Sequence, residues 1–354
     1  MIFHFPFSIR RAFSLPLGGL GWASFVLLLF LIAANLFCGS VDIPVAETLR
    51  ILTSGEATKA SWQYIILDSR LPQTITALLC GASLAASGLL LQTAFRNPLA
   101  GPSILGITNG ASLGVALVML LTGGVLSLSG SDIHFTGVIA IIAGAFLGAL
   151  IVIAILLAFA TVVSNHIMLL IVGIMVSYLT SSIVSILNFF ANADNIQSFV
   201  LWGMGSFSDV SNAQLPWFSA ICLLGILCAL LLIKPLNALL LGDNYAENLG
   251  INTRSARRQL LIVTGILTAV TTAFCGPIAF IGLAVPHIAR MITKTSNHAI
   301  LLPATMLCGA NIALLCNIIC TMPHNMIMPI NAITPLFGAP VIIYVLTSKL
   351  KIEN

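Results

Sequence analysis

The charged side chains that could carry chemistry gather in one short stretch, residues 235–259 (PLNALLLGDNYAENLGINTRSARRQ). The chain has only 14 Lys and Arg and 10 Asp and Glu. Five of these stand in the stretch, with Lys234 at its edge: Asp243, Glu247, Arg254, Arg257 and Arg258. Carboxylates and guanidinium groups this close together can form ion pairs or contact another protein. The sequence offers no nucleophile–base pair of the kind that would indicate an enzyme.

A short helix is predicted inside this stretch, where Gly242 and Gly250 bracket the segment DNYAENL. Asp243 can cap its N-terminus, and Gly250 can supply the left-handed residue that ends it. A two-turn helix is marginal alone in water, so we expect it to pack on another protein. The alternative is a short amphipathic helix at the membrane surface without a partner.

Nucleotide and metal chemistry have no motif in the sequence. It contains no GxxxxGK[ST] phosphate-binding loop, so any transport work must draw its energy from a partner. The eight cysteines lie almost entirely in apolar runs, where thiols pack as small hydrophobic groups. We therefore expect no cofactor, no metal site and no disulfide framework.

Composition indicates the fold class. The chain is 59% hydrophobic and 7% charged, with a mean hydropathy of +1.10, whereas soluble domains are about 25% charged. Its apolar runs are continuous, as in membrane helices, and do not alternate as barrel strands do. We expect an all-α polytopic membrane protein forming a single transmembrane domain over residues 1–354.

Ten apolar runs are predicted to span the bilayer, taking about 17–25 residues as a crossing. They are residues 20–38, 71–94, 103–122, 135–160, 167–190, 214–233, 257–275, 277–293, 299–319 and 334–348. The first run follows Arg10 and Arg11 and ends at Cys38. A lipoprotein signal would need a small residue where Phe37 stands, so we expect a retained transmembrane helix.

The basic residues predict the orientation. With a cytoplasmic N-terminus, 11 Lys and Arg lie on the inner side and 3 on the outer side, namely Arg50, Lys59 and Arg70. This distribution obeys the positive-inside rule. Both termini and the loop at about 235–256 are then cytoplasmic.

The predicted spans carry no acidic residue at their centres. A carboxylate in the middle of the membrane commonly marks an ion or proton pathway. This pattern counts against an ion-coupled secondary transporter, which stays the alternative from another functional class.

Prolines and glycines interrupt the helical pattern at three places. Asn97-Pro98 and Gly101-Pro102 predict a turn after the second span, and Gly276-Pro277 begins the eighth run. Pro286 is expected to interrupt that run. Broken helices at membrane depth commonly line a cavity or are buried in protein.

The polar side chains of the eighth run and the small residues of the spans each allow two interpretations. His287 and Arg290 share the cytoplasmic end of the run, where snorkelling to the interface is favoured over a polar clamp or a partner contact. Small residues recur at helix-packing spacing (Gly81, Ala85 and Gly88; Gly106, Gly110 and Gly114; Gly144 and Gly148). They favour packing within the chain over a dimer seam.

Segments ordered along residues 65–350 resemble the FecCD-type permease subunits of ATP-binding-cassette (ABC) importers. The matching pieces are Arg70-Leu-Pro; Gly81-Ala-Ser-Leu-Ala-Ala-Ser-Gly; Leu91-Gln92; Asn97-Pro-Leu-Ala; Ile104-Leu-Gly106; Asn109-Gly-Ala; Trp202-Gly-Met-Gly; Leu241-Gly-Asp; Leu249-Gly250; residues 276–290; and residues 335–340. The resemblance implies the type II importer fold with ten helices. It also implies a homodimer, two cytoplasmic ABC ATPase subunits, an extracytoplasmic substrate-binding protein and a bacterial inner membrane, with no nucleic acid.

The same resemblance implies a cargo and a coupling element. The cargo is a bulky metal chelate, with ferric siderophore favoured and cobalamin or haem as alternatives, and ATP hydrolysis belongs to the separate ATPase. The coupling residues lie at positions 242–250. Ala246 and Leu249 enter the ATPase groove, and the polar rim consists of Asp243, Tyr245 and Glu247, between Gly242 and Gly250.

Docking and gating residues follow from the resemblance as well. Arg70, with Asp68 beside it, matches an arginine that docks the binding protein. Gln73 stands where a second arginine is expected, so the chain departs from the family pattern there. The predicted cytoplasmic gate lies between the fourth and fifth spans and comprises Ser164, Asn165 and His166, although a plain interfacial turn explains these three residues equally well.

Overall fold

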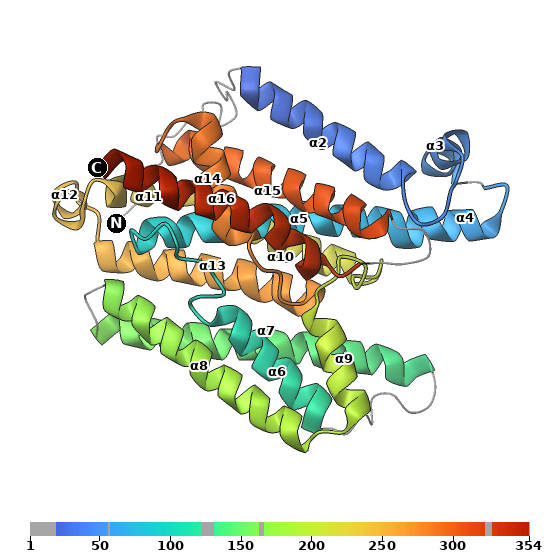
Figure 1. The fold of residues 1–354 in the computed structure, drawn as a ribbon, viewed down its shortest axis with the longest axis horizontal. Helices are drawn as coiled ribbons and strands as arrows, with labels where there is room; N and C mark the ends of the chain where they lie inside the picture. Colours follow the sequence, from blue (N-terminus) through green and yellow to red (C-terminus); the bar gives the residue numbers. More distant parts are fainter. Residues whose placement is uncertain (1–18, 56, 122–130, 163–165, 323–327, 354) are drawn as a thin grey trace, which may run out of the picture.

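The computed structural model describes residues 19–55, 57–121, 131–162, 166–322 and 328–353. These residues form a bundle of helices that run mostly along one long axis (Figure 1), and no strand occurs among them. In chain order the elements are α2 (Gly19–Phe37), α3 (Val45–Ser54), α4 (Ala60–Tyr64), the π-helical η1 (Ile65–Arg70), α5 (Leu71–Ala94), α6 (Ile107–Leu121), α7 (Ser131–Val162), α8 (His166–Phe190), α9 (Ala193–Gly203), α10 (Leu215–Leu231), α11 (Ile233–Leu240), α12 (Asp243–Asn248), α13 (Thr253–Cys275), α14 (Ile281–Thr293), α15 (His298–Thr321) and α16 (Ile330–Glu353).

Each of the ten predicted spans coincides with one helix, and the all-helical membrane class is confirmed. Five helices of the described chain are long and apolar enough to cross a bilayer by themselves. The bent pair α10 and α11, at 48°, would make a sixth. Shorter apolar helices lie within α2, α6, α14 and α16, so ten crossings stay a prediction.

Helix α5 is the centre of the bundle. Of its most apolar window, 89% is buried, against 22% for α7 and 17% for α8. Helices α10, α13, α14 and α15 pack around α5, whereas α6, α7 and α8 form a second group that joins the first through α13 (Figure 1). Apolar side chains of α7 and α8 face outward, as expected of helices that contact lipid.

Small residues allow the closest helix contacts. A Cβ added to Gly81 would collide with Gly309 of α15, and one on Gly110 or Gly114 with Gly148 or Gly144 of α7. The interpretation of these stripes as packing within the chain is therefore confirmed, because the partners are helices of the same protomer.

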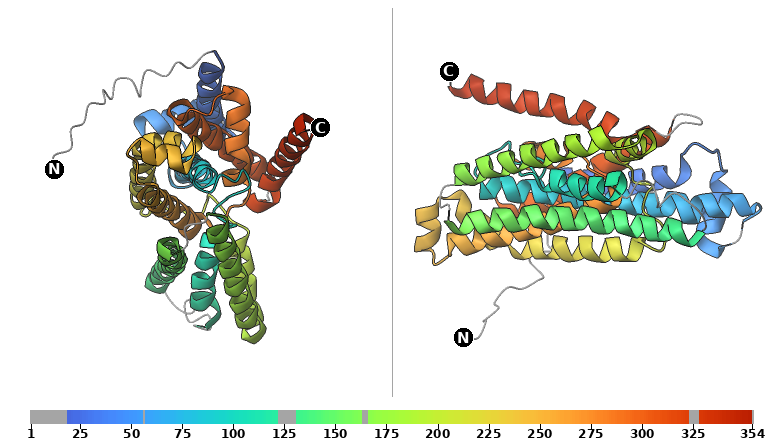
Figure 2. Two further views of the ribbon diagram at one scale, coloured as in Figure 1. Left: turned by 90° about the vertical axis from the view of Figure 1, so that its left-hand side faces the viewer. Right: turned by 90° about the horizontal axis from the view of Figure 1, so that it is seen from below.

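The bundle has two distinct ends (Figure 2). Helices α11 and α12 lie at one end, here called the α12 end, and α3 and α4 lie at the other, the α3 end. Helix α16 leans away from the bundle and finishes toward the α12 end (Figure 2). It packs on α14 and α15.

Candidate functional site

The short helix α12 forms where the glycines predicted it. Gly242 precedes it at φ 114° and Gly250 follows at φ 78°, both conformations that favour glycine. The expected cap is wrong in one respect: Gly242 occupies the N-cap position, and Asp243 is the first residue of the helix. The Asp243 carboxylate binds arginines of the bundle instead.

Three exposed apolar side chains lie on and beside α12, among exposed polar residues that include Asn244, Glu247 and Asn248. Leu241, Tyr245 and Leu249 are 63%, 52% and 58% exposed, whereas Ala246 is completely buried against the bundle. The expectation that Ala246 points to a partner is therefore corrected. Ala246 is the buried residue of this six-residue helix, so it anchors α12 on the bundle.

Asp243 lies between two arginines. Nη2 of Arg257 is 2.8 Å from both of its carboxylate oxygens, and Nη2 of Arg96 is 2.7 Å from Oδ1. The Arg257 side chain is 15% exposed, and its Nε donates to the carbonyl of Ala94 at the end of α5. The carboxylate thereby joins α12 to α5 and α13.

The second acid of α12, Glu247, makes a more local contact. Its Oε1 accepts a hydrogen bond of 2.9 Å from Oγ1 of Thr253, the first residue of α13. Glu247 itself is exposed at the α12 end. This bond closes the turn between the two helices and reaches no other element.

The predicted break after α5 is confirmed and extends over residues 95–106 before α6 begins. Asn97 donates its backbone N–H to the carbonyl of Gln92. The carbonyl of Pro98 lies 2.8 Å from Nε2 of His287, a buried residue of α14. This connection therefore packs back onto the bundle.

Arg290 makes a polar clamp in place of the favoured snorkelling. Its Nη1 donates to Oε1 of Gln92 at 2.7 Å, and Nε2 of Gln92 donates to the carbonyl of Leu283 at 3.1 Å. Gln92 is 3% exposed. The side chain of one α5 residue thus holds α14 near both of its ends.

The second break lies before α14 and not within it. Helix α14 begins at Ile281 and continues through Pro286, so neither Gly276-Pro277 as the helix start nor Pro286 as an interruption is correct. Phe280 precedes the helix at φ 67°, an uncommon conformation for a residue with a Cβ. The actual break covers residues 276–280.

Asn331 of α16 satisfies the backbone at this second break. Its Oδ1 accepts from the N–H of Ala279 at 3.0 Å. Its Nδ2 donates to the carbonyl of Gly203 at 3.1 Å and also to that of Pro277. One amide therefore ties α9, the break and α16 together.

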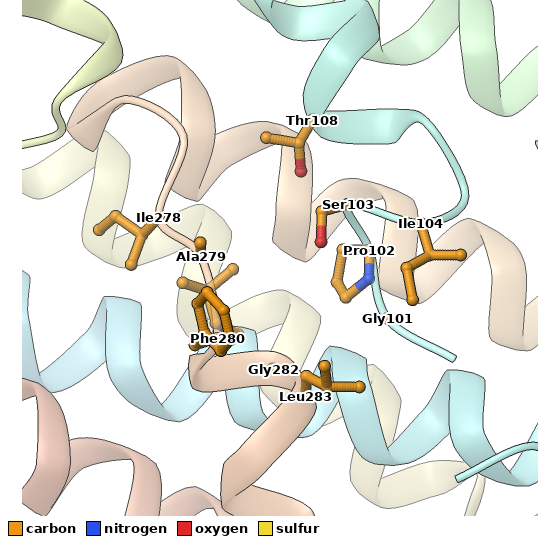
Figure 3. A pocket seen from close by; sticks show the side chains of 11 residues that line it. Gly101, Pro102, Ser103, Ile104, Thr108, Ile278, Ala279, Phe280, Gly282 and Leu283 are labelled. Carbon is orange, nitrogen blue, oxygen red and sulfur yellow. The ribbon is translucent and has the colours of Figure 1, made fainter. Parts of the chain in front are cut away.

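The two breaks meet at a cavity of about 100 Å³ (Figure 3). Ser103 and Thr108 line it from the first break and the start of α6, while Phe280, Gly282 and Leu283 line it from the second break and α14. A Cβ on Gly106, next to this lining, would contact Gly173 and Ser177 in the middle of α8. The cavity thus lies level with the middle of α8, and Ser103 at its edge is exposed.

The predicted docking residue Arg70 is not at the surface. It is 6% exposed, and its guanidinium donates to the carbonyls of Leu36 and Phe37 at 3.0 Å and to that of Val41. This arrangement ties the end of α2 to the start of α5 and counts against a direct docking contact. Asp68 is exposed and accepts from Nδ2 of Asn212 at 2.6 Å.

A small separate core shapes the α3 end. Ile43, Ile51 and Ile66 pack α3 on η1. Hydrogen bonds from the side chain and backbone of Thr58 lower the pKa of Glu47. The α3 end is therefore folded around a core distinct from the central one.

The remaining predicted residues are only partly described. Ser164 and Asn165 lie outside the described residues, and His166 begins α8, so the gate stays a prediction. In the part of the chain described, no group of three or more His, Cys, Asp or Glu side chains could hold a metal ion.

Three polar residues make contacts that the sequence did not predict. Gln92 stood in a recognised motif without a role, and Arg96 counted only as a cytoplasmic charge. Asn331 carried no sequence signal. Each acts on a segment far away in the chain, which local spacing does not reveal.

Comparisons with known proteins match the chain over nearly its whole length. A model of the FecCD transport family matches residues 27–348. The vitamin B12 import system permease protein BtuC of Klebsiella pneumoniae subsp. pneumoniae is 36% identical, over 91% of each chain. The hemin transport system permease protein HmuU of Yersinia pestis is 33% identical, over 91% of this chain and 94% of that protein.

A solved structure agrees with these relatives. A chain of a metal-chelate type ABC transporter in an inward-facing conformation has a TM-score of 0.79 and 31% identity, covering 93% of this chain and 98% of its own. Sequence and fold therefore agree over the region that contains α12, both breaks and the cavity. The chain belongs to the FecCD transport family and is a transport subunit, not an enzyme.

Proposed function

We propose that this chain is the permease subunit of an ATP-driven importer for a bulky metal chelate. The observation that carries the proposal is the group of exposed apolar side chains on and beside α12, namely Leu241, Tyr245 and Leu249. Exposed apolar side chains at the charged end of a membrane protein are typical of a contact with another protein. An ABC ATPase at these side chains would supply the energy, which accords with the missing phosphate-binding loop.

The proposed complex is a homodimer with two ATPases at the α12 end and a binding protein at the α3 end. The relatives are import permeases, and basic residues lie on α11, α13 and α14 near the α12 end. By the positive-inside rule, this end is cytoplasmic in the bacterial inner membrane, and both termini lie on that side.

Transport follows from a difference between two tilts of the bundle. Closure of the ATPases moves the paired α12 helices, and the two broken segments change which side the pathway opens to. Each nucleotide state must favour one tilt of the bundle, because otherwise ATP could not drive transport. Residues 164–166 would form the inner gate.

Ferric siderophore is the proposed cargo because it is the commonest cargo of the permeases that this chain resembles. The cavity of about 100 Å³ is too small to hold such a chelate and does not distinguish between cargoes. The named relatives carry vitamin B12 or hemin, so these are the competing cargoes. Competition of labelled cobalamin, haem and a ferric chelate for uptake by the reconstituted complex separates them. Uptake blocked by unlabelled cobalamin but not by the ferric chelate would contradict the siderophore assignment.

The energy source is tested in vesicles that contain the permease with its ATPase and binding protein. We expect uptake to require ATP on the ATPase side and to continue in the presence of an uncoupler. Uptake that collapses with the uncoupler and needs no ATP would identify an ion-coupled carrier and refute the proposal.

A further inference from the structure

The contacts of Asp243 continue from α12 into the bundle. We propose that Asp243 is the positioning residue through which movement of α12 is transmitted to α14, the helix that follows the second break. This inference rests on the proposed function, because it assigns a route to the same ATP-driven change.

Helix α12 needs side-chain contacts to transmit movement. It has six residues and lies between two glycines at positive φ, so its backbone connections are permissive. Within α12, only Ala246 is buried. A small methyl group can anchor the helix but provides little resistance to sliding or tilting. The ion pairs of Asp243 are directional, and they act at the N-terminus of the helix.

The first step of the route runs from Asp243 to α5. Arg257 contacts both carboxylate oxygens and also the Ala94 carbonyl, the last of α5. Arg96, two residues beyond Ala94, contacts the same carboxylate and has a φ of 46°. Displacement of Asp243 must therefore either break these contacts or move the end of α5, or α13, with it.

The second step runs from the end of α5 to α14. Residue 96 is followed by Asn97, whose N–H binds the Gln92 carbonyl, and by Pro98, whose carbonyl lies 2.8 Å from His287 Nε2. The side chain of Gln92 binds both Arg290 and the Leu283 carbonyl. Leu283 also lines the cavity between the two breaks. Three contacts thus connect α12 with the cavity wall. Asp243 binds Arg257, Arg257 binds the Ala94 carbonyl, and Gln92, two residues earlier in α5, binds the Leu283 carbonyl.

The polar contacts along this route are partly shielded from water, which helps them to transmit movement. The side chains of Asp243 and Arg257 are 32% and 15% exposed, Gln92 is 3% exposed and His287 is 6% exposed. Polar contacts that are partly withdrawn from water are less screened by salt and hold their geometry better than surface pairs. A connected network of this kind can carry a coupling free energy between distant sites.

The test follows α12 and α14 separately with spin labels. The labels are attached through Asn248→Cys in α12 and Met291→Cys in α14, both at exposed positions. In the same background Cys38 and Cys228, the two thiols that are not fully buried, are replaced by serine. Spectra are recorded with and without MgATP in the reconstituted complex with its ATPase. Both labels should respond to ATP when Asp243 is intact.

In Asp243→Asn the response of the α12 label should persist while the response of the α14 label falls by roughly tenfold, the size of an ordinary coupling energy. Arg257→Gln should behave in the same way. Asp243→Glu, which keeps a carboxylate, should restore a large part of the response at α14. A merely structural role would not separate the two labels.

Arg258→Gln is the matched control, since it removes an equal charge from the neighbouring position of α13, and Arg258 is exposed. It should leave both responses within about twofold of the parent. Should Asp243→Asn fail to fold, Arg96→Gln removes one of the contacts at a side chain that is 35% exposed. A reduced response of the α14 label in this variant would support the inference, and an unchanged response would contradict it.

Two results would overturn the inference. One is a response at α14 that survives both Asp243→Asn and Arg257→Gln. The other is loss of ATPase binding in Asp243→Asn, which would make Asp243 a direct partner contact. A parent protein whose labels ignore ATP altogether would instead refute the proposed function.

Discussion

The carbonyl of Gly282, the second residue of α14, lies directly against Gly88 in the second half of α5, and a Cβ on Gly88 would overlap it. A Cβ added to Gly282 itself would lie 3.0 Å from the Leu84 carbonyl oxygen of α5 and 3.2 Å from Cδ of Pro102. The start of α14 is therefore held between α5 and the first break. This close approach brings the two breaks together at the cavity and depends on the absence of side chains.

Gly88→Ala is expected to destabilise the protein. The new methyl group would push α14 away from α5, and overpacking of this kind costs about 1–3 kcal/mol or more. A thermal melt of the purified protein in detergent should show a clear fall in Tm.

The control for this prediction is Gly203→Ala at the end of α9, where an added Cβ meets nothing within 4 Å. Its Tm should stay close to that of the parent. Equal melting temperatures for Gly88→Ala and Gly203→Ala would show that the close approach of α5 and α14 is not needed for stability.

Substitution by arginine should have different effects at an exposed and at a buried residue of the α12 region. Leu249→Arg places a charge among the exposed apolar side chains, so co-purification of the ATPase should be lost while the Tm of the permease stays unchanged. Ala246→Arg buries a charge against the bundle, so it should lower the Tm itself. Pull-down and melting are measured for both variants. An intact complex in Leu249→Arg would remove α12 from the ATPase interface.

Arg70→Gln should affect stability more than docking. Loss of the guanidinium leaves the partly buried carbonyls of residues 36, 37 and 41 without this donor. Each unsatisfied buried group costs about 1–3 kcal/mol. The Tm should fall accordingly, with the exposed Arg50→Gln as control near its parent value.

Binding-protein association at low and high salt completes this experiment. If Arg70 were a docking arginine at the surface, its replacement would weaken association mainly at low salt. If Arg70→Gln did so without any change in Tm, Arg70 would be a docking residue after all.

Asn331→Leu should disturb the second break. It removes the acceptor for the Ala279 N–H and the donor for the carbonyls of Gly203 and Pro277. Hydrogen exchange of residues 276–281 should accelerate, and transport should fall, because this segment lines the cavity.

Asn212→Leu is a suitable comparison, since its amide bonds only at the exposed α3 end. It should leave exchange at residues 276–281 unchanged. Unaltered exchange in Asn331→Leu would mean that the break holds its shape without the amide.

The membrane class, the positions of the ten apolar helices and the place of α12 all followed from the amino-acid sequence alone. The reason is local, because a backbone in lipid must satisfy its hydrogen bonds within a helix, and long apolar runs bounded by polar or glycine residues report that requirement. The glycine stripes likewise predicted packing within the chain, since spacing along one helix defines its face.

The directions of the side chains and the groups they bind were set by tertiary packing. Ala246 faces the bundle, Arg70 is buried, and Asp243 pairs with Arg96, 147 residues away. The break before α14 fell at residues 276–280, where Asn331 satisfies the backbone, while Pro286 stayed helical. These outcomes depend on contacts between segments that are distant in the chain, and such contacts exist only after the helices have packed.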